Sequence, residues 1–569
     1  MSLSASAPWV RHYGNTPAHL DYPDHSMYSL LAETARQYPD QIAYDFLGKK
    51  TTYARFMQRI DAAAKGLCAL GIQTGDTVTI CMPNSPQAVD CFYALNRIGA
   101  IANVIHPLSA ATEIAFYLNI SGSKAVLTLD QFYEKIASVL PQVSQSCTVL
   151  VARIQEELPF PKNILYPMTK SGRKGRNLTK SGYLLWQDVI RREAELPPHR
   201  VAADGHAVTL YSGGTSGTPK GIMLSSRNFN ALGLQTIAAS GFGSVAGMKM
   251  LSVMPIFHGF GLGIGIHTAL IGGASCILIP QFNMKTYTQT LLRQKPNLIP
   301  GVPTLFETLL RSQDMDGKNL GFLQGIFCGG DSLSPELKKK VDTFLLAHGC
   351  AQQIREGYGT TECVIASCLT PKDHARTGSI GVPFPDMYYK IVKPGTTDEV
   401  QAGTDGEICI CGPTVMLGYL NNPEETAAAL RSHPDGKIWL HTGDLGMMDE
   451  DGFVYFRQRI KRMIVTSGYN VYPAQLENII DGHEKVLLSC VIGVKDAYRG
   501  QRIRAYVVPR PGIAPTEELK QEVLRYCARH IAKYAMPREW IWRHELPKTA
   551  VGKVAYRVLE EEALQEETK

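Results

Sequence analysis

The stretch HAVTLYSGGTSGTPKG, residues 206–221, places an apolar run directly before a loop of glycines, hydroxyl side chains and one lysine. The run is typical of a buried strand, and a strand ending in such a loop commonly offers its backbone N–H groups to an anion. The loop is not a Walker phosphate loop, because Pro219 stands before Lys220 where a glycine is required, and Gly221 follows it. It does not match the dinucleotide pattern G-x-G-x-x-G either. Taken alone, the stretch predicts an anion site at a strand end or a flexible turn.

Strand-like and helical segments alternate on both sides of this stretch. AVLTL (125–129) and CILI (276–279) have the continuous apolar character of buried strands. The segment NSPQAVDCFYALNRIGA predicts a helix with Ser85 as its N-cap, Pro86 in its first turn and Gly99 after its last turn. This alternation indicates the α/β fold class, with helices layered on sheets.

Composition and cysteine usage exclude several classes of protein. Of the 569 residues, 44% are hydrophobic and 19% are charged, which is typical of a folded globular protein of at least two domains. Thirteen cysteines are scattered singly without a C-x-x-C pair, so we expect reduced thiols rather than a disulfide framework or a zinc site. The first twenty residues lack the apolar segment of a secretory signal. We therefore expect a cytoplasmic protein.

The charge distribution argues against a nucleic-acid partner. The net charge of +6 arises from 58 basic and 52 acidic residues, without the long basic blocks of nucleic-acid-binding tails. Residues 153–195 are more polar than their surroundings and include five basic side chains between Lys170 and Lys180. We expect this basic loop to be a solvated surface excursion rather than a contact to a membrane or to coenzyme A (CoA).

One segment imitates a membrane span. From Leu251 to Met284 the chain contains no Asp, Glu, Lys or Arg, which meets the length criterion for a transmembrane helix. Pro255 and recurrent glycines interrupt it, so we expect a buried part of the α/β core instead. The expected elements are a strand, a glycine-rich helix and a second strand, at 251–257, 259–272 and 275–279.

The last part of the chain predicts a separate small unit. It contains two short apolar strands, CVIGV (490–494) and IRAYVV (503–508), and an amphipathic helix that begins after Thr516. A boundary is expected near residue 460. Arg459, Ile460 and Lys461 lie there and are candidates for a hinge.

Five motifs in a fixed order identify a family resemblance. They are YSGGTSGTPKG (211–221), EGYGTTE (356–362), HTGDLG (441–446), RQRIKRMIVTSGYNVYP (457–473) and LPKTAVGK (546–553). Together they make the chain similar to the adenylate-forming superfamily of AMP-binding enzymes, in its group of acyl-CoA synthetases for fatty and aryl acids. The resemblance implies a large N-terminal α/β domain of several subdomains (1–458), a hinge (459–461) and a small mobile α+β C-terminal domain (462–569).

The resemblance implies a two-step ligase reaction. A carboxylic acid attacks the α-phosphate of ATP and releases pyrophosphate, and the thiol of CoA then takes the acyl group from the acyl-AMP and releases AMP. ATP, Mg²⁺, CoA and a small carboxylic acid are therefore the expected partners, with self-association and peripheral contact with a membrane left open. Alternatives are transfer of the acyl group to a carrier protein, a luciferase-like enzyme, and an inactive nucleotide-binding regulator.

The opening loop and a glutamate are assigned to the phosphates by this resemblance. The family's Mg²⁺ ligand corresponds to Glu362, and a hard carboxylate oxygen suits a cation that bridges phosphates. Thr360 corresponds to the residue that contacts the α-phosphate. The residues expected around the β- and γ-phosphates are Thr215, Ser216, Gly217, Thr218 and Lys220.

A second group is assigned to the nucleoside. Tyr358 resembles the residue whose ring stacks on adenine, opposite the backbone of the GGD segment (329–331). Asp444 resembles the acid that accepts hydrogen bonds from both ribose hydroxyls, for which an ionised acceptor is suited. Arg459 resembles the ribose-contacting arginine beside the hinge. The nucleoside-binding residues expected on this basis are Gly330, Asp331, Tyr358, Gly359, Asp444 and Arg459.

The C-terminal motifs supply the residue expected to matter most for adenylation. Lys553 corresponds to the family's lysine that lies over the attacking carboxylate and the α-phosphate, where its charge offsets their mutual repulsion. The family then rotates its small domain about the hinge at Lys461. That motion withdraws the lysine and brings the segment with Gly468 and Tyr469 to the CoA thiol.

The acid itself is constrained by one position. Amino-acid-activating relatives have an Asp in the segment that corresponds to PIFHGFG, and this chain has His258 in its place. An ammonium group without a carboxylate partner would be costly to bury, so an amino acid is disfavoured. His258 is expected either to gate the acid site or to belong to the core. The glycines at 259, 261 and 263 either leave room for an apolar tail or allow close helix packing.

Overall fold

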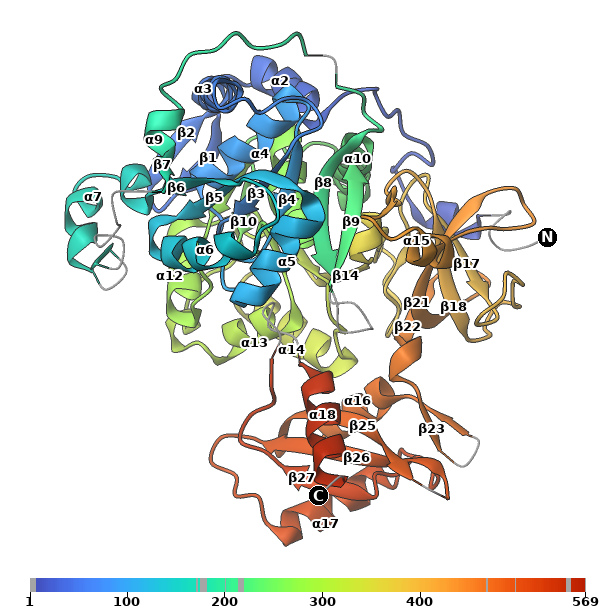
Figure 1. The fold of residues 1–569 in the computed structure, drawn as a ribbon. Helices are drawn as coiled ribbons and strands as arrows, with labels where there is room; N and C mark the ends of the chain where they lie inside the picture. The colour runs from blue at the N-terminus through green and yellow to red at the C-terminus, as the bar shows by residue number, and fades with distance from the viewer. Residues whose placement is uncertain are drawn as a thin grey trace.

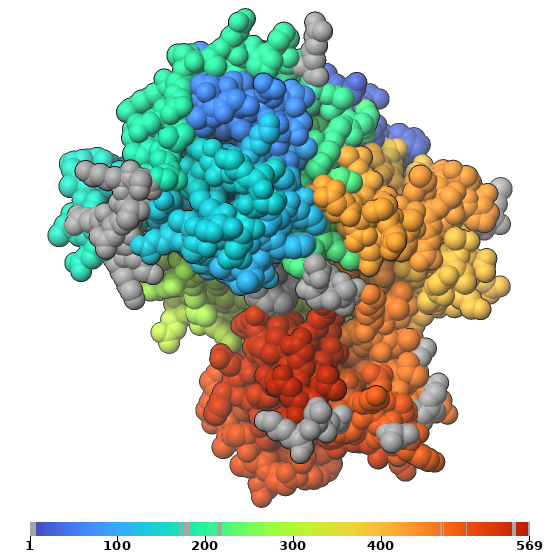
Figure 2. Space-filling model, viewed as in Figure 1, coloured from blue at the N-terminus to red at the C-terminus, as the bar shows by residue number. Residues whose placement is uncertain are grey.

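The structure is a computed structural model that describes residues 7–169, 172–173, 182–199, 201–212, 219–466, 469–496, 498–548 and 554–567. Figure 1 shows a large body of sheets and helices, a smaller β-rich lobe beside it and a C-terminal lobe below. In the space-filling view the C-terminal lobe, orange to red, lies against the underside of the body (Figure 2).

The first sheet of the body is mainly parallel. Its central strands pair in parallel from β1 through β11, β10, β12 and β13 to β14, whereas the strands at both edges are antiparallel. The ends of parallel strands therefore gather at one edge, where α/β proteins usually bind ligands. In spatial order the strands are β16 (Val382–Pro383), β15 (Cys368–Leu369), β14 (Ile354–Tyr358), β13 (Gly325–Cys328), β12 (Leu298–Gly301), β10 (Lys249–Ser252), β11 (Ser275–Leu278), β1 (Ile42–Phe46) and β2 (Lys49–Thr52).

The second sheet contains the opening stretch. HAVTL forms part of β8, which pairs antiparallel with β9, so that the glycine-rich loop joins two neighbouring strands. In spatial order the strands are β19 (Gly418–Tyr419), β9 (Lys220–Ser225), β8 (His206–Ser212), β4 (Ile101–Val104), β3 (Thr77–Cys81), β5 (Ser123–Leu129), β6 (Thr148–Ala152) and β7 (Leu184–Leu185).

Helices fill the space between these two sheets and cover their outer faces (Figure 1). α4 packs on strands of the second sheet, α3 on strands of the first, and α10 joins the second sheet to the π-helix η7, which packs on β10. One continuous apolar core spans both sheets and these helices. The helices of the body are α2 (Met27–Gln37), α3 (Tyr53–Ala69), α4 (Pro86–Ile98), α5 (Ala111–Ser121), α6 (Tyr133–Val139), α7 (Lys162–Leu165), α9 (Trp186–Val189), α10 (Ser226–Ser240), η7 (Phe260–Thr268), α11 (Ala269–Ile271), α12 (Met284–Gln294), α13 (Pro303–Arg311) and α14 (Pro335–Ala347).

Several local predictions are confirmed by these bounds. α4 begins at Pro86, Ser85 accepts a hydrogen bond from the Ala88 N–H at 3.4 Å, and Gly99 ends the helix in the left-handed conformation. AVLTL lies in β5, and CILI overlaps β11. All thirteen cysteines are unpaired thiols.

The uncharged segment forms core elements with bounds that differ from the prediction. Among the described residues, no helix combines the length and apolar character needed to cross a membrane. The predicted strand at 251–257 is wrong in extent, because β10 ends at Ser252. The predicted helix at 259–272 is a π-helix followed by the short α11. Within this helix the Thr268 side chain also donates through Oγ1 to the Gly263 carbonyl at 2.8 Å.

The β-rich lobe is a five-stranded antiparallel sheet with one short helix. Asp444 on β21 pairs directly with Arg459 at the end of β22. Its elements are β17 (Tyr388–Val392), β18 (Gly406–Cys411), α15 (Pro423–Ala429), β20 (Leu430–Ser432), β21 (Ile438–Met448) and β22 (Val454–Arg459).

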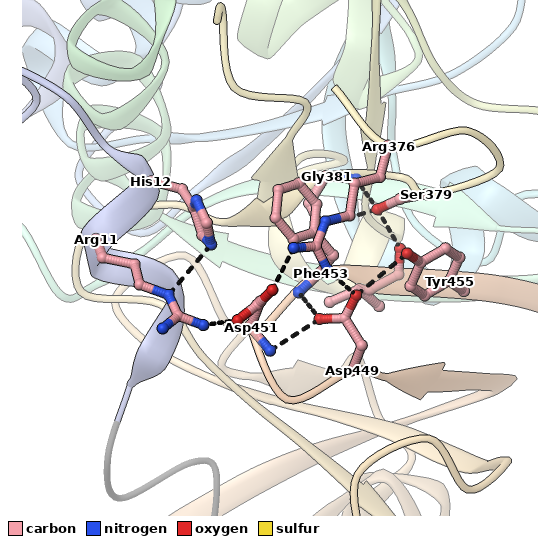
Figure 3. A network of polar contacts seen from close by, with 10 residues as sticks. Arg11, His12, Arg376, Ser379, Gly381, Asp449, Asp451, Phe453 and Tyr455 are labelled. Carbon is pink, nitrogen blue, oxygen red and sulfur yellow. Dashed lines mark hydrogen bonds and ion pairs between the residues drawn. The ribbon is translucent and has the colours of Figure 1, made fainter. Parts of the chain in front are cut away.

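A polar network ties the N-terminal segment to this lobe. Figure 3 shows Arg11, from the 3₁₀ helix Pro8–His12, paired with Asp451 in the turn between β21 and β22. The Arg376 guanidinium bridges Asp451 and Asp449 and lies 4.2 Å above the ring of Phe453. Because Arg11 and Arg376 both pair with Asp451, the turn, the N-terminal segment and the loop before β16 are held together.

The C-terminal lobe has cores of its own. Its two apolar clusters contain only residues from Ile464 onward. Thr516 caps α17 as expected, accepting from the Leu519 N–H at 3.2 Å. The elements are β23 (Ile464–Thr466), β24 (Tyr469–Val471), α16 (Pro473–Asp481), β25 (Val486–Asp496), β26 (Gly500–Pro509), α17 (Glu517–Cys527), β27 (Glu539–Trp542) and α18 (Tyr556–Glu567).

Candidate active site

The buried carboxylate of Asp444 contacts two other predicted residues, Tyr358 and Arg459. Asp444 is 1% exposed, and the Tyr358 hydroxyl donates to its Oδ2 at 2.6 Å. The Arg459 Nε lies 2.8 Å from its Oδ1. Burial, reinforced by the charge of Asp444, holds the pKa of Tyr358 well above its usual value, so the phenol remains a proton donor. These residues come from β14, β21 and β22, and the structure brings them together at the edge where β14 ends.

A second group forms around Glu362 and Lys220. The Tyr419 hydroxyl donates to Glu362 Oε1 at 2.9 Å, and Lys220 Nζ lies 4.7 Å from the centre of the Tyr419 ring. The same Nζ lies 2.5 Å from Glu425 Oε2, and its hydrogen bond lowers the pKa of that carboxyl. The predicted phosphate lysine and the predicted metal ligand therefore share one aromatic neighbour.

Tyr419 and Glu425 were not predicted from the sequence. Both lie in the segment that follows strand β18 of the β-rich lobe, far along the chain from the motifs that they contact. The sequence carries no local signal for these contacts, because they depend on β19 pairing with β9.

The EGYGTTE segment leaves β14 and turns sharply. Thr360 is 4% exposed and its N–H donates to Cys363 Sγ at 3.3 Å, at the start of the single turn Thr361–Cys363 that carries Glu362. A side chain at Gly359 would meet the Ile365 carbonyl oxygen at 2.4 Å, so only glycine fits. The turn thus places Tyr358, Thr360 and Glu362 in succession along one edge.

The GGD segment lies beside this edge. Gly330 has φ +79°, and the exposed Asp331 accepts from the Ser332 N–H at 2.9 Å through Oδ1. Glu356, the first residue of EGYGTTE, was not predicted as a site residue, and its Oε1 accepts from the Leu333 N–H at 3.3 Å. Burial raises the pKa of Glu356 to about 7. This glutamate holds the loop that follows the GGD segment.

An apolar cavity of about 60 Å³ opens from the same edge. It reaches the backbone of Gly330 and of Gly357, the residue before Tyr358. Cys328 and Leu298 also line it, and Leu298 pairs with Gly325 at the opposite end of β13 from Cys328. At the usual rise per residue of a strand, the cavity therefore extends about 10 Å along the sheet.

The π-helix η7 lines the cavity with one face and packs with another. A side chain at Gly261 would meet the Pro255 carbonyl oxygen at 2.0 Å, and one at Gly263 would meet Leu232 at 2.7 Å. Of the two roles left open for the glycines, close packing is the one that the structure supports. The residues of η7 that line the cavity are Phe260, Ile264 and Thr268.

The remaining predicted residues are placed less directly. His258 lies just before η7, and its Nδ1 accepts from the Phe260 N–H at 3.3 Å. Lys461 lies in the 3₁₀ turn that follows Arg459, and Tyr469 stacks on Tyr534 at 4.5 Å within the C-terminal lobe, not on the group around Asp444. Seven predictions lie outside the described residues: Thr215, Ser216, Gly217, Thr218, Gly468, Lys553 and part of the basic loop at 170–180.

Several known proteins resemble this chain over nearly its whole length. The chain is 34% identical to a long-chain-fatty-acid--CoA ligase of Bacillus subtilis, covering 98% of this chain and 99% of that protein. It is 31% identical to an enzyme of the same name from Salmonella typhimurium, covering 98% of each. ATP-bound MatB from Rhodopseudomonas palustris superimposes with a TM-score of 0.80 at 26% identity, covering 95% of this chain and 99% of that one. The anthranilate CoA ligase AuaEII in complex with anthranoyl-AMP shares the fold, with a TM-score of 0.83 at 22% identity over 97% and 98% of the chains.

Two protein-family models match the chain, one over its larger N-terminal part and one over its C-terminal part. The model described as AMP-binding enzyme matches residues 31–420, and the model described as AMP-binding enzyme C-terminal domain matches residues 475–553. Together they span the body, the β-rich lobe in part, and most of the C-terminal lobe. The chain therefore belongs to the family of AMP-binding enzymes.

Proposed function

We propose that this protein is an acyl-CoA synthetase that joins a long-chain fatty acid to CoA. In the first step the carboxylate attacks the α-phosphate of ATP, forming acyl-AMP and pyrophosphate. In the second step the CoA thiol attacks the acyl carbon, forming the thioester and releasing AMP. The observation that carries the proposal is the apolar cavity that reaches Gly357, the residue before Tyr358, whose hydroxyl donates to Asp444.

The chemistry requires charge and position rather than an enzyme nucleophile. Both nucleophiles belong to substrates, and two anions must meet at phosphorus. Lys220 and Arg459 provide positive charge along the edge at which β14 ends. Glu362 has the hard carboxylate oxygens that Mg²⁺ prefers and would hold this ion against the phosphates. Asp444 would accept from the ribose hydroxyls, as a buried ionised carboxylate can.

The cavity supports an apolar acid. Its walls are mostly apolar, and their polar side chains, Thr236, Ser240 and Thr268, carry no charge. An ammonium or a second carboxylate inside the cavity would therefore lose water without gaining a charged partner. The relatives named as long-chain-fatty-acid--CoA ligases support an alkyl chain over an aryl ring. His258, two residues before Phe260 in the cavity wall, would lie near the carboxyl end of the acid.

We also propose the division of the chain that the motifs suggest, with domains at 1–458 and 462–569 and a hinge at 459–461. Separate apolar cores on the two sides of this segment support it. Rotation at this hinge would place Lys553 beside the reacting group in the first step. In the second step it would place the segment with Gly468 and Tyr469 there instead. Thirteen unpaired thiols support a reducing compartment, the cytoplasm, which cell fractionation would test.

The reaction is tested by a panel of carboxylic acids assayed for pyrophosphate release with and without CoA. We expect saturated fatty acids to give the highest kcat/KM, rising with chain length, and the acyl-CoA thioester to form in equal amount to AMP. Pyrophosphate release without any thioester would favour transfer to a carrier protein or a luciferase-like reaction. No release with any acid would favour an inactive regulator.

The cavity's role is tested by filling its far end. Phe260 begins η7 near Gly330, and Ala269 lines the cavity just after the other end of this helix. Ala269→Phe should lower kcat/KM for long acids by about 10- to 100-fold relative to short ones, because its ring occupies the space that the tail of a long acid needs. Turnover of short acids by the same variant controls for folding. Equal losses for short and long acids would contradict the assignment.

The two-conformation proposal predicts opposite defects for two variants. Lys553→Ala should slow adenylation by about a hundredfold or more, because a positioned charge is lost, and should spare thioester formation from supplied acyl-AMP. Lys461→Pro, which fixes φ at the hinge, should slow thioester formation more than adenylation. The two half-reactions are measured separately by pyrophosphate release and by thiolysis of synthetic acyl-AMP. If both variants lose both half-reactions equally, neither role holds.

A further inference from the structure

Three side chains that can bind metal ions meet inside the β-rich lobe. Cys409 lies on β18, His433 follows β20 and His441 lies on β21, where it pairs directly with Cys409 across the sheet. One potential ligand atom from each lies within 4.8 Å of the other two. All three are buried, with exposed fractions of 0%, 4% and 7%. None of them belongs to the ATP or acid sites described above.

His441 is oriented as a metal ligand usually is. Its Nδ1–H donates to Glu407 Oε2 at 3.0 Å, which leaves the lone pair on Nε2. That Nε2 lies 3.0 Å from the Nε2 of His433. A carboxylate that fixes the tautomer and direction of a histidine is the common outer partner of zinc-binding imidazoles.

His433 is incompletely satisfied by protein groups. A proton between the two Nε2 atoms would give one hydrogen bond, but within the described part of the chain its buried Nδ1 has no hydrogen-bond partner. Trp439 and Val392 pack around Cys409 and make the surroundings apolar.

We propose that Cys409, His433 and His441 bind one zinc ion. A thiolate and two imidazoles are a donor set that Zn²⁺ favours over Mg²⁺ or Ca²⁺, and three protein ligands leave a fourth position for water. On binding, the Cys409 thiol gives its proton to solvent and its sulfur bonds to the metal. The two positive charges of the ion are then matched by the thiolate and by the Glu407 carboxylate, so the buried group is neutral as a whole.

The position of this site suggests what the ion would stabilise. Glu407 Oε1 also accepts from the Gly443 N–H at 3.1 Å, directly before Asp444 on β21. A metal bound to His441 would therefore hold Glu407 in place. Through its hydrogen bond to Gly443, Glu407 would in turn hold the part of β21 that positions Asp444. This consequence rests on the proposed function, whereas the binding of zinc does not.

Zinc binding is tested with full-length protein lacking any histidine tag. The protein is loaded with Zn²⁺, passed through gel filtration with a competing chelator, and analysed for zinc by mass spectrometry. We expect about one zinc per chain in the wild type, and less than about a tenth in Cys409→Ser and His433→Gln, because each removes a ligand. Cys411→Ser, which changes the next cysteine on β18 outside the cluster, should bind zinc as the wild type does.

Two further measurements separate a metal site from a merely structural cluster. Glu407→Gln should weaken zinc affinity by about 10- to 100-fold, since it loses the orienting carboxylate. Co²⁺ in the wild type should give a thiolate charge-transfer absorption that Cys409→Ser lacks. Circular dichroism confirms that each variant is folded. Wild-type protein without stoichiometric zinc, or zinc retained equally in Cys409→Ser and His433→Gln, would overturn the proposal.

Discussion

A single buried carboxylate holds the parts of this site together. Asp444 is almost without solvent contact, and an ionised carboxylate in that position is tolerated only with donors of its own. The donors come from different parts of the fold: the Tyr358 hydroxyl from the nine-stranded sheet and the Arg459 guanidinium from the strand that leads to the C-terminal lobe. The body, the β-rich lobe and the proposed hinge therefore meet at one charge.

Around this charge the protein separates two opposite environments within a short distance. One contains the cation of Lys220 and the carboxylates of Glu362 and Glu425, which suit phosphates and Mg²⁺. The other is the apolar cavity, whose lining includes the backbone of Gly330 and Gly357. Glycines at this boundary let a polar head and an apolar tail of one substrate lie against the two environments. That arrangement is what an acyl adenylate requires.

The sequence predicted those features that depend on local pattern. The helix from Pro86 to Ile98 was expected from its caps, and Tyr358, Asp444 and Arg459 were expected together from their motifs. The extent of β10 was not predicted correctly, because the apolar residues after Ser252 fit a strand or a tight loop equally well. The π-helical form of residues 260–268 was also missed, since it depends on how closely Gly261 and Gly263 approach their neighbours.

Features that depend on long-range pairing could not be predicted. Tyr419 reaches Glu362 only because β19 pairs with β9, and no spacing of residues in the sequence predicts this pairing. The same holds for the cluster around His441. Its cysteine and two histidines are separated along the chain and lack the close spacing by which zinc sites are usually found, so a search for C-x-x-C pairs passes over them.

The central claim, that Asp444 holds the ribose of ATP beside the apolar cavity, is tested most directly by a thermodynamic cycle. Dissociation constants are measured calorimetrically for ATP and for 2′,3′-dideoxy-ATP, with the wild type and with Asp444→Asn. The account predicts that the wild type binds ATP about 10- to 100-fold more tightly than the dideoxy analogue, as hydrogen bonds to a charged acceptor do, and that the variant binds both alike. A variant that keeps the full preference for ATP would contradict it.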